Sequence, residues 1–107
     1  MSGVSSGAKI TYGSYTGKGS YGKSNPTTIY CSFNPCMIIL RQENAIMEIN
    51  FSTKSESKFQ INNQYNSGEW INYITWTSYK VSWYSTVSDS VQFNRSNVKY
   101  YYCIIGN

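Results

Sequence analysis

The sequence contains no histidine and few carboxylates. The carboxylate side chains are those of Glu43, Glu48, Glu56, Glu69 and Asp89. Without histidine, the chain lacks the most common general base and metal ligand, and cannot form a Ser-His or Cys-His nucleophile pair. Glycoside hydrolysis needs two carboxylates facing each other across a cleft, and the spacing of these five nominates no pair. We therefore expect a protein that is not an enzyme and that uses no cofactor or metal.

Cysteine is also scarce, and its three positions are Cys31, Cys36 and Cys103. An odd number in a short chain is not a disulfide framework, and three thiols without histidine fall short of a closed zinc site. All three lie in apolar, strand-like runs, so we expect buried free thiols, as in a chain folded in a reducing compartment. The first residues carry no apolar segment typical of a secretory signal, and no apolar run approaches the length of a membrane helix.

Tyrosine is abundant, with 11 residues, and the aromatic share is 17%. The net charge is +4, and the nine basic residues are scattered without a run. Proteins that neutralise phosphates gather Lys and Arg on one face, so we regard nucleic acid as an unlikely partner. Single-strand binding on a tyrosine-lined barrel stays open as an alternative, because aromatic platforms with positive charge are its required parts.

Apolar residues alternate with polar ones along most of the chain, which is typical of half-buried strands. Positions 36–40 instead form a continuous apolar run, Cys-Met-Ile-Ile-Leu, which predicts a strand covered on both faces. Further strands are expected around 9–13, 29–33, 45–51, 59–61, 70–77, 79–84 and 98–105, with turn residues between them. No helical stripe occurs. We predict an all-β antiparallel sandwich of about eight strands, with residues 1–8 as a flexible arm and 9–107 as a single domain.

A glycine-rich segment, residues 17–24, reads Gly-Lys-Gly-Ser-Tyr-Gly-Lys-Ser. It fits both G-x-G-x-x-G and the phosphate-binding pattern G-x-x-x-x-G-K-S. Either motif must open a helix whose amides hold phosphate, but Pro26 and the strand-forming residues after it exclude a helix here. We expect a glycine-rich hairpin or bulge, in which glycine supplies positive φ.

The same segment carries a resemblance to a family. The run Tyr15 to Gly22 followed by Asn25-Pro26 resembles the "YTGxGxYG…NP" opening of C-terminal domains in bacteriophage tail and tail-fibre proteins. The strand Phe33 to Ile39, the Val-Ser-Trp-Tyr-Ser at 81–85, Gln92-Phe93-Asn94, and the closing 99–106 resemble later motifs of the same domains. The middle, 43–76, matches no motif of the family.

The resemblance implies an H-type-lectin-like sandwich, a homotrimer, and a host-recognition role in the virion tail, with synthesis in the bacterial cytoplasm. We expect the protein to bind a host cell-surface glycan or receptor. We also expect it to contact other tail proteins and not to insert into a membrane. Aromatic rings stack on sugars while polar groups bond their hydroxyls. The candidate ligand-binding residues are Trp70, Tyr73, Trp76, Asp89 and Arg95. The alternative is a purely structural trimeric tail-tip or fibre protein, with aromatics and the 37–40 run in the trimer interface.

Overall fold

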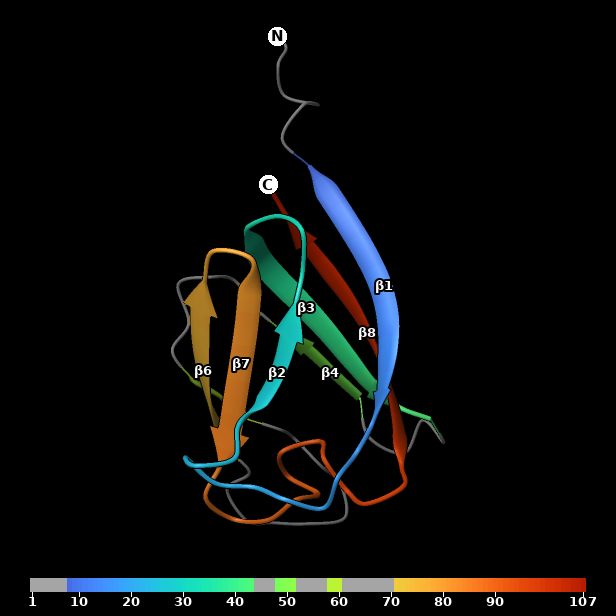
Figure 1. Ribbon diagram of the computed structural model, residues 1–107, viewed down its shortest axis with the longest axis vertical. Helices are drawn as coiled ribbons and strands as arrows, with labels where there is room; N and C mark the ends of the chain where they lie inside the picture. The colour runs from blue at the N-terminus through green and yellow to red at the C-terminus, as the bar shows by residue number, and fades with distance from the viewer. Residues whose placement is uncertain (1–7, 44–47, 52–57, 61–70) are drawn as a thin grey trace, which may run out of the picture.

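The computed structural model describes residues 8–43, 48–51, 58–60 and 71–107 of the chain. These residues form eight strands and no helix (Figure 1). The strands are β1 (Lys9–Thr16), β2 (Thr27–Tyr30), β3 (Pro35–Gln42), β4 (Glu48–Phe51), β5 (Lys58–Gln60), β6 (Ile71–Thr77), β7 (Lys80–Ser85) and β8 (Lys99–Gly106). The prediction of an all-β chain is confirmed.

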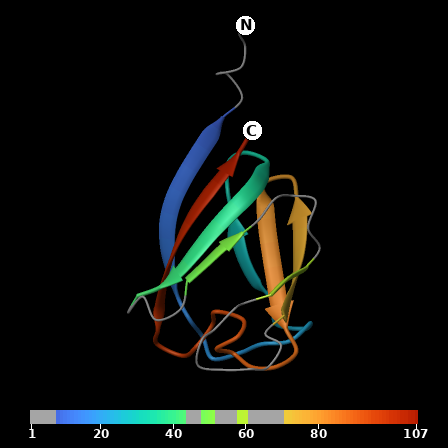
Figure 2. The same cartoon turned by 180° about the vertical axis from the view of Figure 1, so that it is seen from behind.

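The strands are arranged in two antiparallel sheets that face each other, as Figures 1 and 2 show from opposite sides. Sheet A has the strand order β1-β8-β3-β4, and sheet B has the order β2-β7-β6-β5. The last strand, β8, therefore lies between β1 and β3, with Tyr12 opposite Cys103 and Cys103 opposite Ile39. This arrangement is sandwich-like, and among the described residues its edge strands are β1 and β4 in sheet A and β2 and β5 in sheet B.

The core lies between the sheets and follows the alternation predicted from the sequence. Tyr100 and Ile104 from β8 are fully buried, and they face Val81 and Trp83 from β7. Tyr15 from β1 adds its ring, which stacks on Tyr100 at a centroid distance of 5.2 Å. Aromatic pairs at this spacing add stability beyond their buried area. The tyrosine-rich composition therefore supplies core packing as well as surface.

The prediction that the 36–40 run is covered on both faces is wrong. Ile38 and Leu40 point into the core and are fully buried, but Met37 is 37% exposed and Ile39 is half-buried. A continuous apolar run indicates burial on both sides. Within the described residues, however, only the inner face of sheet A is covered by a second sheet.

Three smaller expectations also change. The three cysteines are free as predicted, but each is half-buried rather than buried. The expected strand at 29–33 ends at Tyr30, although Phe33 beyond it is still buried. Most of the expected arm, and parts of the strands expected at 45–51, 59–61 and 70–77, lie outside the described residues.

Two adjacent isoleucines on β8 test which face of sheet A packs into the core. Ile104→Ala should lower the free energy of unfolding by about 2–5 kcal/mol, because it leaves a cavity between the sheets. Ile105→Ala, on the outer face, should cost about 1 kcal/mol or less. Urea unfolding at low protein concentration measures both. Equal losses would mean that the outer face of sheet A is packed as tightly as the core.

Candidate functional site

The glycine-rich segment joins β1 to β2 and lies against the segment between β7 and β8, residues 86–98, at one end of the sheets (Figure 1). A Cβ on Gly17 would overlap the backbone carbonyl oxygen of Arg95, so only glycine fits there. Gly19 and Gly22 adopt φ of 82° and 102°, a region that favours glycine. The glycines thus serve close packing and turn geometry, as the sequence context predicts.

Three successive backbone amides of this loop, those of Gly17, Lys18 and Gly19, donate to acceptors inside the chain. Gly17 donates to the Val98 carbonyl at 2.7 Å, and Gly19 donates to the Asn94 carbonyl at 2.7 Å. The amide of Lys18 donates to Asn94 Oδ1 at 3.0 Å. A phosphate-binding loop needs such N–H groups free and pointing at the ligand. These amides therefore form no phosphate cradle, despite the match to the sequence pattern.

The buried side chain of Gln92 fixes the end of the loop. Its Oε1 accepts from the amides of Gly22 at 3.0 Å and Ser85 at 2.9 Å. Its Nε2 donates to the Asn25 carbonyl at 2.8 Å and to Thr27 Oγ1 at 3.0 Å. One fully buried amide thus joins the loop, the start of β2 and the end of β7, with every hydrogen-bonding position used.

Asn94 holds the middle of the loop in the same way. Besides accepting from the Lys18 amide, it donates from Nδ2 to the carbonyl and hydroxyl oxygens of Ser20, at 2.7 and 3.2 Å. Between the two amide residues, Phe93 is fully buried with φ of 60°, which is uncommon for a bulky residue. We call Gln92 and Asn94 the amide clamp.

The clamped loop forms one wall of a polar groove with a volume of about 320 Å³. The groove is lined by Tyr15, Thr16, Lys18, Ser20, Asn25, Pro26, Thr27, Thr28 and Asn94. Its lining offers threonine and serine hydroxyls, amide groups and one cation, the ammonium of Lys18, and it contains no carboxylate. This set can bond a neutral, hydroxyl-rich or anionic ligand, but it provides no acid-base pair for catalysis.

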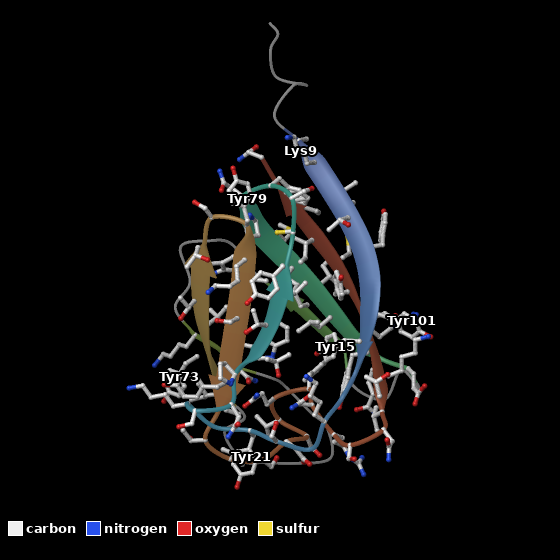
Figure 3. All side chains as sticks on the ribbon, viewed as in Figure 1. Lys9, Tyr15, Tyr21, Tyr73, Tyr79 and Tyr101 are labelled. Carbon is white, nitrogen blue, oxygen red and sulfur yellow. The ribbon has the colours of Figure 1, made fainter. Side chains whose placement is uncertain are left out.

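Tyr15, at the base of the groove, contributes its ring rather than a free hydroxyl. Its phenol donates to the Phe93 carbonyl at 2.9 Å (Figure 3 labels Tyr15). Burial raises the pKa of Tyr15 well above its ordinary value, and the nearby Tyr100 phenol adds to the rise. Burial also raises the pKa of Tyr100, although the Arg95 amide, which donates to its oxygen at 3.0 Å, acts in the opposite direction.

The structure does not bring the predicted site residues together. Tyr73 is 40% exposed on the outer face of sheet B and stacks on Tyr84 at 5.2 Å. Trp76 points to the opposite face of β6 and packs against the core. Asp89 is half-buried and its carbonyl accepts from the Asn94 amide, while Arg95 is exposed beside the clamp. Trp70 lies outside the described residues.

Sequence reasoning therefore missed the groove, although it quoted most of its parts. Lys18 and Ser20 entered only as letters of a phosphate motif and of a family resemblance, and Gln92 and Asn94 only as letters of that resemblance. The sequence offered one signal for this site. Gln92 and Asn94 flank a phenylalanine, and the backbone amides of the glycine-rich loop needed acceptors from another part of the chain.

Comparison with protein-family models, curated proteins and solved structures finds no match to this chain. In the described part of the chain, no group of three or more His, Cys, Asp or Glu side chains is placed to hold a metal ion. That part also contains no helix with the length and apolar character to cross a membrane. Functional inference therefore rests on the chain's own geometry.

The amide clamp should be a main source of stability. Gln92→Met keeps the approximate shape of the side chain but leaves the amides of Gly22 and Ser85 without an acceptor. Each buried amide without a partner costs about 1–3 kcal/mol. We expect a loss of about 3 kcal/mol or more in urea unfolding. Thr27→Val, which removes one of the four bonds, is the control and should cost about 1 kcal/mol. A loss for Gln92→Met no larger than that of the control would contradict the role of the clamp.

The buried tyrosines predict alkaline sensitivity. Their pKa values are raised in the folded state, so below about pH 10, the ordinary tyrosine value, both states keep the proton and stability is unaffected. Above that pH the unfolded chain releases protons that the folded chain retains, and stability falls. Tyr15→Phe should be less stable near neutral pH but should show a shallower alkaline fall. Urea midpoints over a pH series, with ultraviolet absorbance of tyrosinate, measure this. An equally steep fall in the variant would refute it.

Proposed function

We propose that this protein is a host-recognition module of a bacteriophage tail, built on an H-type-lectin-like sandwich, and that it binds a cell-surface glycan in the polar groove. The observation that carries the proposal is the groove itself, with its hydroxyl, amide and ammonium lining on a clamped loop. The family resemblance of the loop sequence supports the same function.

Sugar recognition matches the chemistry of the groove. A sugar presents many hydroxyl groups, each able to donate and accept, and the threonine and serine hydroxyls that line the groove can do the same. A volume of about 320 Å³ lies at the small end of ligand pockets, so it suits the end of an oligosaccharide better than a large cofactor. A loop fixed by Gln92 and Asn94 also loses little further freedom on binding, which favours affinity.

A second location for the glycan is the outer face of sheet B, where the predicted residue Tyr73 lies. Tyr73 and Tyr84 stack there, with Thr75 beside Ser82 in the next row of cross-strand pairs. A ring pair with neighbouring hydroxyls suits stacking against the apolar face of a sugar. The groove adds a hollow of about 320 Å³ lined by several hydrogen-bonding side chains, so we place the principal site in the groove.

The alternative function is a purely structural tail-tip or fibre protein without ligand binding. The outer face of sheet A favours it, because Met37, Ile39 and Tyr101 leave apolar surface there for contact with another chain. The homotrimer and the other tail proteins remain predictions from the resemblance, as does the location in the virion tail. The two functions are separated by whether the protein binds glycan at all.

A glycan array followed by calorimetric titration of the hits tests the proposal. Lys18→Ala should weaken binding by about tenfold or more, equivalent to about 1.4 kcal/mol, because it removes the one cation of the groove. Lys23→Ala is the matched control: it removes an exposed lysine from the same loop that does not line the groove, and should leave the affinity nearly unchanged.

Other results would redirect the proposal. Loss of glycan binding in a Tyr73→Ala variant, together with unchanged binding by Lys18→Ala, would move the site to the outer face of sheet B. Absence of binding to any glycan and to host cells would leave the structural alternative. Each variant must first keep the wild-type melting temperature, so that lost binding is not lost folding.

A further inference from the structure

The outer face of sheet A is apolar along two adjacent rows of cross-strand neighbours. Ile10, Ile105 and Met37 form one row across β1, β8 and β3, and Tyr12, Cys103 and Ile39 form the next. Tyr12 is 73% exposed and Ile10 is 52% exposed. We call these six residues the apolar face.

The outer face of sheet B differs in character. Two of its rows read Thr28, Ser82 and Thr75, and then Tyr30, Lys80 and Thr77, while a third row holds the stacked pair Tyr84 and Tyr73. A sheet face that stays in water is expected to be polar in this way, while contiguous exposed apolar surface marks an interaction site. Two adjacent apolar rows occur on sheet A, whereas polar rows flank the aromatic pair of sheet B, so the outer face of sheet A is the better surface for a protein partner.

The apolar face has a projection and a hollow side by side. Tyr12 stands out from the edge strand β1, and beside it lies a shallow hollow of about 260 Å³. The hollow is lined by Tyr12, Ile39, Arg41, Tyr101, Tyr102 and Cys103. Arg41 and Lys99 lie over the ring of Tyr101, at 5.7 and 5.4 Å, and mark the charged boundary of the face.

We infer that a second copy of this chain packs on the apolar face, with Tyr12 of each copy entering the hollow of the other. Because the projection and the hollow lie on the same face, the contact is isologous and produces a pair of chains. A trimer, which the family resemblance implies, would instead need two different surfaces on each chain. The inference concerns a face separate from the groove, and it stands or falls independently of glycan binding.

The size of the apolar face sets the expected strength of association between the two copies. The six residues occupy two rows, about 7 Å apart along three strands that are spaced about 4.8 Å, so the apolar face spans roughly 200 Å² on each copy. A stable, specific interface uses about 800 Å² on each partner. The free edge of β1, which pairs with no second strand in the described part of the chain, can add contact with the other copy. We therefore expect a reversible pair that depends on concentration.

Sedimentation equilibrium of the reduced protein, from micromolar to millimolar concentration, tests this inference. The wild-type mass should rise from one chain toward two. Tyr12→Lys should raise the dissociation constant by about tenfold or more, since the ammonium would be buried without an anionic partner in a hollow that already holds the Arg41 guanidinium. Ile105→Lys, in the neighbouring row, should act in the same direction and guards against a local effect of one variant.

Tyr30→Lys is the matched control. Tyr30 is 74% exposed on the edge strand of sheet B, nearly the same exposure as Tyr12 on the edge strand of sheet A. The Tyr30→Lys variant should have the same dissociation constant as the wild-type protein. A wild-type protein that stays a single chain at millimolar concentration would overturn the inference, as would a mass of three chains or an equal effect of the Tyr12 and Tyr30 variants. Glycan titration of Tyr12→Lys reports separately on the groove.

Discussion

The hydrogen bonds of one buried amide, Gln92, organise the end of the molecule where the groove lies. Its four bonds connect the glycine-rich loop, the first residue of β2 and the last residue of β7, segments that are far apart in sequence. A buried amide is costly unless every donor and acceptor is paired. The loop must therefore supply its partners in one fixed conformation. Asn94 extends the same constraint to Lys18 and Ser20, so the groove is shaped before any ligand arrives.

The glycines are explained by the same constraint. In a nucleotide-binding loop, glycine lets backbone amides approach a phosphate. Here the approach is between two parts of one chain: Gly17 lies against the Arg95 carbonyl, and the loop amides bond to the segment between β7 and β8. An identical sequence pattern thus serves a different purpose, because the element that follows it is the strand β2 rather than a helix.

Local rules predicted the strands well, since the period of two is visible in the sequence and burial alternates along β7 as that period requires. They failed where the outcome depends on what lies opposite. Met37 and Ile39 are as apolar as Ile38 and Leu40, and only the position of sheet B decides which pair is buried. The amide clamp was equally inaccessible, because the Gly22–Gln92 bond spans 70 positions and leaves no local pattern. Tyr73 and Trp76 are three positions apart and so lie on opposite faces of a strand, but which of the two is exposed followed only from the topology.

The two proposals assign different surfaces and therefore reinforce each other. The groove is lined by the end of β1, the β1–β2 loop, β2 and Asn94, whereas the apolar face belongs to the outer side of β1, β8 and β3 nearer the start of β1. A pair joined through sheet A would leave both grooves open to solvent. A small polar groove binds a single sugar weakly, because few atoms are buried and each polar group must first lose its water. Two linked grooves on a repeating surface polymer bind with an effective concentration that can raise avidity by orders of magnitude. Weak single-site affinity is then compatible with firm attachment to a cell, provided that the spacing of the grooves matches the repeat of the polymer.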